Sequence, residues 1–426
     1  MPSSTTTQRK NKAVAPDVTT TASKPSSVSF TQLRKDVARI TAEELAKEPK
    51  YYRLICNLTG LRRAQDCKTL LWMSIYFGSG VLLWNWAKWM PAQIADNWFA
   101  WAAVYYINIF WSFLGAVITH NTMHQAMFYS TFMNRVIQVL LTLSYGHPVS
   151  SYVPGHNLSH HKYTQSRKDV MNTHLLQYKS HLVNLLLFSP TVTWSVLQSD
   201  LRYILYQQYN NNIAGINQAL RELLAHTVVQ FACLFLSPWK FLLYFHIPHA
   251  CAQYGIVTLN MLQHDGCEEF IPDTEEVNFN TSRNYVNYWV NFFCLNNGYH
   301  TIHHLAPTSH WSLGKALHDQ LIIPNIDQRL ICPSMAQFVY DNYLANGNPW
   351  NKEPRRLDYK NREIQVRPRE DESRITYEEW LNFPKSFDQS KLPSSTGELI
   401  PAIFLLTFKF AVSPLYSFDP NVKGFA

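Results

Sequence analysis

The chain has 426 residues, of which 46% are hydrophobic and 16% charged, and its formal net charge is +7. The charged fraction is lower than the roughly 25% of a typical soluble domain. The mean hydropathy of −0.19, however, is too low for a chain that is apolar throughout. These values favour a few membrane spans joined to substantial polar mass. They exclude nucleic acid as a partner, because the basic residues do not interleave with aromatic ones in any one segment, and they suit a surface facing anionic lipid or an acidic protein.

The seven cysteines are irregularly spaced and form no CxxC motif. This pattern argues against a disulfide framework or a thiolate metal site and favours a reducing compartment.

Residues 1–30 are rich in Ser, Thr and Pro and contain a single acid, Asp17. Because they lack an apolar core, they do not resemble a secretory signal, and either a disordered tail or an organelle transit peptide is expected. Residues 31–68 are expected to form an amphipathic lead-in to a membrane and metal-binding domain over 69–320. Residues 321–426 are expected to be a cytosolic C-terminal extension.

Two uncharged segments, 69–86 and 98–119, are each long enough to cross about 30 Å of hydrocarbon. Tryptophans crowd around the short link between them, as in an interfacial aromatic belt: Trp84, Trp86, Trp89, Trp98 and Trp101. A second, less regular hairpin is expected near 223–259, with a kink at Pro248.

Four further apolar segments are too short to cross and are expected to lie in the interface: 132–146, 183–198, 285–295 and 399–417. The distribution of Lys and Arg places both termini and residues 120–222 on the cytoplasmic or stromal side. The predicted fold is therefore all-α, with four transmembrane helices in two hairpins, interfacial helices and a cytosolic helical cap.

Polar clusters rich in histidine recur at four places on that side of the membrane. They are "HNTMH" (120–124), "HNLSHH" (156–161), "NMLQH" (260–264) and "HTIHH" (300–304). At about 100° per residue, positions i and i+4 of an α-helix share a face, whereas a neighbouring residue points elsewhere. A same-face pair can therefore hold one ion while the rotated imidazole reaches a second. The candidate ligands are His120, His124, His156, His160, His161, Asn260, His264, His300, His303 and His304.

The ligand type narrows the metal. All-imidazole sites suit Zn, Cu, Fe or Ni, but structural zinc takes four ligands and usually includes Cys. Nine histidines exceed that number. Iron accepts more nitrogen ligands and keeps open positions, and a paired iron site beside a membrane suits O₂-dependent attack on an apolar chain.

The other histidines receive simpler interpretations. His174, His181 and His318 are expected at the surface. Packing or a position along a substrate tunnel is expected for His147, His226, His246 and His249. His310 is a candidate partner that supports a ligand.

Three of the four clusters, "HNTMH", "HNLSHH" and "HTIHH", resemble in order the three histidine boxes of the integral-membrane fatty acid desaturase and hydroxylase superfamily. With the flanking hairpins, the resemblance covers about residues 65–315. "NMLQH" is similar to the extra Asn/His pair of the acyl-CoA desaturase branch, where the Asn acts through a water. The resemblance implies eight catalytic histidines in the boxes and two non-haem iron ions. It assigns roughly His120, His124 and His160 to one ion and His156, His161 and His264 to the other, with the last box shared.

The resemblance also implies partners and a location. The substrates would be O₂ and an acyl lipid or acyl-CoA lying in a bent tunnel. "HPVS" (147–150) lacks the glycines of a haem-binding HPGG motif, so the electron donor would be a separate cytochrome b5 or ferredoxin, with Lys162, Arg167 and Lys168 as a candidate docking surface. A multi-pass position in the endoplasmic reticulum is expected, with a plastid membrane as the alternative.

Two alternatives to a desaturase stay open. HxxxHH in the middle box also occurs in alkane-type hydroxylases, so a lipid, alkane or carotenoid hydroxylase or ketolase fits the same motifs. A zinc-binding membrane protein, such as a lipid hydrolase or transporter, would hold a different metal.

Overall fold

The computed structural model describes residues 28–345, apart from 167–168, 174–181, 194–195, 197–202, 204–212 and 272–273. The described chain is mostly helical. It contains one short parallel strand pair, β1 (Asn284–Tyr285) with β2 (Ile331–Cys332). The all-α prediction is therefore confirmed. The expectations for 1–27 and 346–426, including the apolar segment 399–417, lie outside the described residues.

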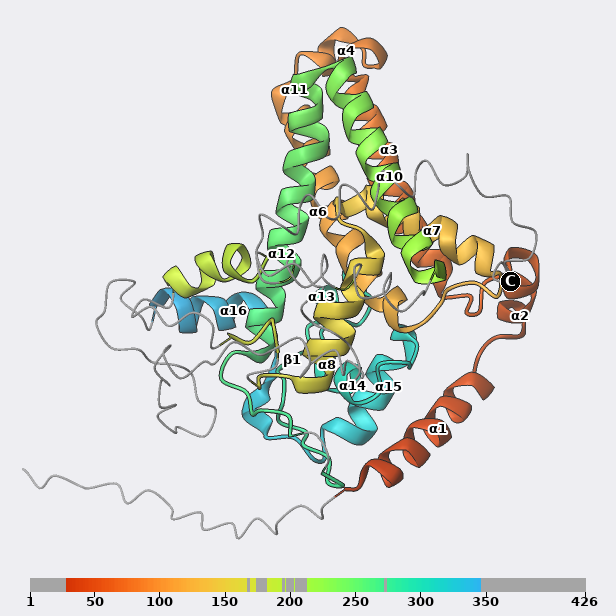
Figure 1. Ribbon diagram of the computed structural model, residues 1–426, viewed down its shortest axis with the longest axis vertical. Coiled ribbons are helices and arrows are strands. Elements are labelled where there is room, and N and C mark those ends of the chain that lie inside the picture. The colour runs from red at the N-terminus through yellow and green to blue at the C-terminus, as the bar shows by residue number, and fades with distance from the viewer. Residues whose placement is uncertain are drawn as a thin grey trace, which may run out of the picture.

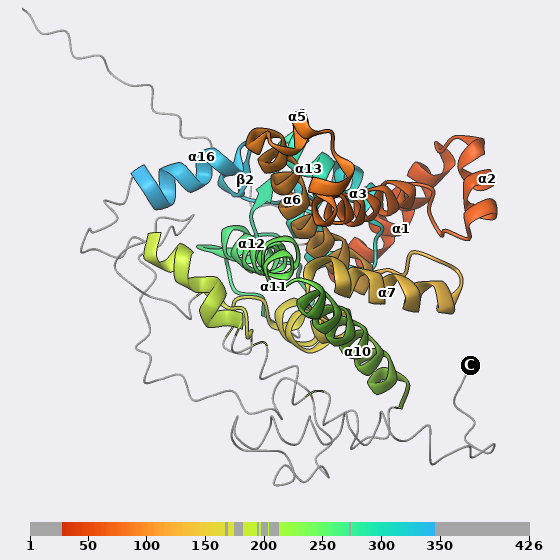
Figure 2. The same cartoon turned by 90° about the horizontal axis from the view of Figure 1, so that it is seen from above.

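Two helical hairpins stand together at one end of the molecule (Figure 1). The first joins α3 (Asp66–Trp84) to α6 (Trp98–His124) through α4 (Trp86–Trp89) and α5 (Ala92–Ala95). The second joins α10 (Ile213–Leu236) to α12 (Ile247–His264) through α11 (Pro238–Phe241) and a π-helical turn, η4 (Leu242–His246). Helix α6 packs against both α3 and α12, whereas α10 lies at the edge beside α7 (Thr131–Tyr145) (Figure 2).

The tips of the two hairpins are tied to each other. Lys240 Nζ donates to the Trp84 carbonyl at 2.6 Å, and Trp101 Nε1 donates to Tyr244 Oη at 3.0 Å. Large apolar side chains nearby point outward, Phe235 being 88% exposed. Exposed apolar surface of this kind marks a membrane or protein contact.

Two described helices are long and apolar enough to cross a membrane, α6 and residues Gly215–Leu236 within α10. Helices α3 and α12 do not reach the same hydropathy, because α3 begins with Asp66 and Lys68 and α12 carries several polar residues. The four predicted helices are thus present and pack as two hairpins, but hydropathy identifies only two of the four as able to cross a membrane.

The predicted distortion at Pro248 takes the form of a π-helical turn. η4 ends at His246, and Pro248 lies in the first turn of α12. Proline lacks an N–H and its ring clashes with the carbonyl four residues earlier, so widening the preceding turn relieves both problems.

The other end of the molecule is a layer of short helices below the hairpins, in which α8 and α14 lie next to each other (Figure 1). The apolar core of the hairpins joins Leu114 of α6 to Leu141 and Tyr145 of α7. A second core packs Leu33 and Ile40 against the segment after the last histidine box. The remaining elements are α1 (Phe30–Ala46), α2 (Lys50–Thr59), η1 (Val149–Ser151), η2 (Val153–His160), α8 (His161–Tyr163), a helix over Leu182–Thr193, α13 (Tyr288–Phe293), α14 (His300–Leu305), η5 (Trp311–Leu313), α15 (Gly314–Leu317), η6 (His318–Ile322), η7 (Gln328–Leu330), α16 (Met335–Val339) and η8 (Tyr340–Ala345).

Candidate metal centre

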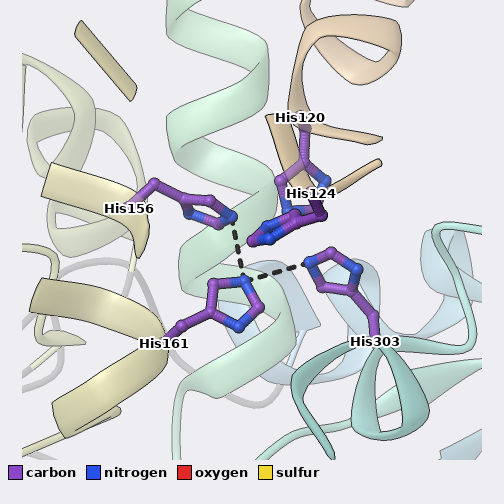
Figure 3. A group of neighbouring side chains, drawn as sticks. All are labelled: His120, His124, His156, His161 and His303. Carbon is purple, nitrogen blue, oxygen red and sulfur yellow. Dashed lines mark hydrogen bonds between the residues drawn. The ribbon is translucent and has the colours of Figure 1, made fainter. Parts of the chain in front are cut away.

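The four polar clusters meet where the hairpins join the short-helix layer. Their histidines form two groups, within each of which the candidate ligand atoms lie no more than 4.8 Å apart. The five-histidine group comprises His120, His124, His156, His161 and His303 (Figure 3). The four-histidine group comprises His160, His264, His300 and His304.

The ring nitrogens of each group converge at short range. His161 Nε2 lies 3.0 Å from His156 Nε2 and 3.1 Å from His303 Nε2 (Figure 3). In the other group, His300 Nε2 lies 2.9 Å from His264 Nε2 and 3.1 Å from His304 Nε2. Two imidazole nitrogens that bind one ion at about 2.0–2.1 Å, at right angles to each other, lie about 3 Å apart. The observed spacings match that edge length.

The chain matches the family model described as "Fatty acid desaturase" over residues 96–328, more than half of its length. The chain belongs to the fatty acid desaturase family. This family implies an oxidoreductase that acts on an acyl lipid with O₂ and an electron donor, that is membrane-associated and that carries a histidine-ligated metal centre. No curated protein matches the chain.

The division of the second desaturase box between the two groups agrees with the sequence-based expectations only in part. His160 joins His264 rather than His120 and His124, to which the family resemblance assigned it. Helical spacing paired His156 with His160, but His156 groups with His161, as the resemblance implied. The reason is that η2 is a π-helix, in which the His161 N–H bonds to the His156 carbonyl. In such a helix the backbone hydrogen bond joins i and i+5, and the wider turn brings residue i+5 onto the same side as residue i.

The other boxes follow the α-helical rule. His120 and His124 lie in one group at the end of α6. In α14, His300 and His304 share the four-histidine group, and His303 turns toward the five-histidine group. Each of the last two boxes therefore contributes to both groups.

Hydrogen bonds fix the tautomers of three members of the four-histidine group. His264 Nδ1 lies 2.9 Å from the Thr281 carbonyl, which can only accept, so Nδ1 carries the hydrogen. His160 Nδ1 donates to Asp169 Oδ2 at 2.9 Å. Thr164 Oγ1 donates its only hydrogen to the His160 carbonyl, and so accepts from His304 Nδ1 at 3.2 Å.

These bonds leave the Nε2 lone pairs of His160, His264 and His304 directed inward. His160 Nε2 is buried and has no hydrogen-bond partner. Lone pairs at such short separations repel one another, and a single hydrogen on His300 cannot satisfy them all. A cation bound among them satisfies every nitrogen, so the residues present fit the metal that the family implies.

The five-histidine group fits a metal for a similar reason. Both ring nitrogens of His120 and Nε2 of His124 are buried without a hydrogen-bond partner. Burial, followed by the proximity of other imidazoles, lowers the pKa of the box residues outside α6 and α12 well below its usual value; these are His156, His161, His300, His303 and His304. Neutral imidazole is the form that binds a metal.

Asn260 lies beside the clusters rather than within one. Its Nδ2 donates to the Met171 carbonyl at 3.2 Å, and its side chain lines a cavity of about 270 Å³. His120 and His156 of one group and His300 of the other also line this cavity. The rest of the wall is largely apolar, including Ile256 and Val257. An apolar chain in this cavity would pass both histidine groups.

Two supporting carboxylates were missed by sequence reasoning. Asp169 accepts hydrogen bonds from His160 and from the backbone N–H groups of Gln165 and Met171. It is the only acid between Asp96 and Asp200, which is a usable signal. Buried Glu222 of α10 accepts from Ser150 N at 2.7 Å and Ser150 Oγ at 3.0 Å. It thereby anchors the segment that leads into the second box.

The predictions for the histidines outside the clusters are confirmed for some residues and wrong for others. His147 lines the large cavity, and His226 and His249 are buried, as expected. His318 is 0% exposed rather than at the surface, because it sits in the core under α1, whereas His246 is exposed. His310 donates to Asp66 and contacts no ligand candidate by a hydrogen bond. His174, His181, Arg167 and Lys168 lie outside the described residues.

Proposed function

We propose that the protein is a membrane acyl desaturase whose two histidine groups each hold one iron ion. The supporting observation is the division of nine imidazoles into a group of five and a group of four, both next to one largely apolar cavity. A single structural zinc takes four ligands, so this arrangement favours two ions. When bound, the iron pair would supply the activation of O₂.

The chain's own residues supply the rest of the site. The histidines of the boxes hold the ions, while Asp169, Thr164 and the Thr281 carbonyl orient the rings. Asn260 faces the same cavity and would act through a water. The cavity wall holds an acyl chain against both groups and excludes bulk water, which protects a reactive site from side reactions.

The wider assignment follows from this proposal. Residues 69–320 form the membrane and metal domain, preceded by the lead-in over 31–68 and followed by the extension over 321–426. All four hairpin helices cross the membrane, in the endoplasmic reticulum or alternatively in a plastid. Electrons come from a separate cytochrome b5 or ferredoxin, and the substrate is an acyl lipid or acyl-CoA.

The test is lipid mass profiling after expression in a host that supplies cytochrome b5. The proposal predicts an acyl product lighter by two hydrogens. It also predicts that His160→Ala and His303→Ala, one from each group, abolish the product, whereas the matched change at exposed His246 does not. A product that gains oxygen would instead identify a hydroxylase or ketolase, and an active His160→Ala variant would reject the metal assignment.

A further inference from the structure

A second cavity also borders the histidines, separate from the cavity beside Asn260, which is called the acyl cavity below. It has a volume of about 40 Å³ and is lined by His303 of the five-histidine group and by Asp66 and His310. Among the described residues, Asn297 lines both cavities, and the two cavities have no other lining residue in common. The second cavity therefore touches the metal centre without passing through the acyl cavity.

The second cavity has a mixed lining that includes enough polar groups to hold water. Three side-chain atoms of its lining are buried without a hydrogen-bond partner, namely Asn121 Nδ2, Gln125 Oε1 and Asn297 Oδ1. Buried polar atoms of this kind are normally satisfied by ordered water, and one water needs about 10–15 Å³ of such space. The cavity is therefore large enough for one or more water molecules that bridge these atoms.

A hydrogen-bonded chain connects this cavity to the half-buried Ser312. His310 Nε2 donates to Asp66 Oδ2 at 3.1 Å. His310 Nδ1 accepts from the Ser312 N–H at 3.2 Å and lies 2.8 Å from Ser312 Oγ. Arg63 Nη2 lies 3.3 Å from the same hydroxyl and holds it in place.

The carboxylate of Asp66 is fixed on its other side. Trp311 Nε1 donates to Oδ1 at 2.9 Å, and Thr69 Oγ1 donates to the same oxygen at 3.1 Å. This leaves Oδ2 for His310 and the cavity. A histidine that accepts at one nitrogen and donates at the other can pass a proton between its two neighbours.

We propose that Ser312, His310 and Asp66 relay protons from solvent to the water in this cavity, and thus to the metal centre at His303. The inference rests on the proposed function, because desaturation needs two protons per double bond. The balance is RCH₂CH₂R′ + O₂ + 2e⁻ + 2H⁺ → RCH=CHR′ + 2H₂O, with both electrons from the one-electron donor. In one passage a proton binds His310 Nδ1, the Nε2 proton moves to Asp66, and Asp66 releases its proton to the cavity water. The imidazole then turns over to restore hydrogen on the nitrogen that faces Asp66, and a second passage delivers the second proton.

The first test asks whether the cavity holds water, and does not depend on activity. Met127 lines the second cavity and is 3% exposed, whereas Met73 is 4% exposed and lines neither cavity. X-ray radiolysis generates hydroxyl radicals from bound water and oxidises adjacent methionines. The relay predicts that Met127 is oxidised several times faster than Met73. Equal oxidation rates for the two methionines would overturn the relay.

The second test uses His310→Gln, which retains a donor toward Asp66 and an acceptor toward Ser312 but cannot pass a proton. Proton transfer by a positioned side chain typically contributes about 10²–10⁴ in rate. We expect at least a tenfold loss of product per O₂ consumed, with peroxide released instead, a larger solvent isotope effect and unchanged metal content. Asp66→Asn should behave alike, and His318→Gln, which removes another buried imidazole, should retain wild-type coupling.

The outcomes separate the two proposals. Wild-type coupling in His310→Gln and Asp66→Asn rejects the relay, as does a parallel loss of metal, which would indicate a purely structural network. A wild-type protein that binds no iron and consumes no O₂ rejects the proposed function itself, whatever the labelling of Met127.

Discussion

Asp169→Asn tests how the protein holds its metal ligands. The Asp169 carboxylate is buried and accepts three hydrogen bonds, from His160 Nδ1, the Gln165 N–H and the Met171 N–H. Asparagine presents an amide group in place of one oxygen. Whichever way it is oriented, at least one buried N–H then faces another donor.

The size of the effect follows from these contacts. An unsatisfied buried donor costs about 1–3 kcal/mol, and loss of the partner behind a ligating histidine lowers metal affinity by about 10–100-fold. A change of 10–100-fold corresponds to about 1.4–2.8 kcal/mol, so the two figures agree. The loss should fall on the four-histidine group, because His160 belongs to it.

The assay is equilibrium dialysis against graded free Fe(II), with bound iron measured per chain. Asp169→Asn should lose one ion at iron concentrations that saturate the wild type, while the other ion stays bound. Asp319→Asn is the matched control, because Asp319 pairs with Lys315 on the surface, away from both histidine groups. Unchanged iron binding by Asp169→Asn would refute the role of this contact.

Two further predictions concern stability. In Gly298→Ala the new Cβ would lie 2.2 Å from the Tyr285 carbonyl, so we expect thermal unfolding to report about 3 kcal/mol of destabilisation. Gly78→Ala, inside α3 and with no atom within 4 Å of its Cβ, should instead be neutral or stabilising by up to about 1 kcal/mol; equal stability of the two variants would contradict this packing. Burial lowers the pKa of His318 to about 4, so the unfolded chain gains a proton that the folded chain does not as pH falls from about 6.5 to 4. Over that pH range the free energy of unfolding of His318→Phe should fall by up to about 3 kcal/mol less than that of the wild type. If the free energies of unfolding of the two proteins fall in parallel with pH, His318 does not titrate in this way.

Local rules predicted part of how the histidines group. The i, i+4 spacing correctly paired His120 with His124 and His300 with His304, since both pairs lie on α-helices. It failed for "HNLSHH", because that rule assumes 3.6 residues per turn and η2 is π-helical. The local helix type, which depends on packing around the segment, decides which histidine joins which group.

Long-range contacts were beyond the sequence. The Asp66–His310 bond joins residues 244 positions apart, and no local pattern indicates it. His318 was assigned to the surface although Leu317, Leu321 and Ile322 around it are buried in the core. Its position one residue from Leu317 and four from Ile322 is a signal that helical periodicity could have used.

The most direct test of the account is the metal content of the purified protein, made without excess zinc. Two histidine groups that each hold an iron ion predict about two irons per chain and no stoichiometric zinc. Stoichiometric zinc without iron, or a single iron per chain at saturation, would contradict the central claim.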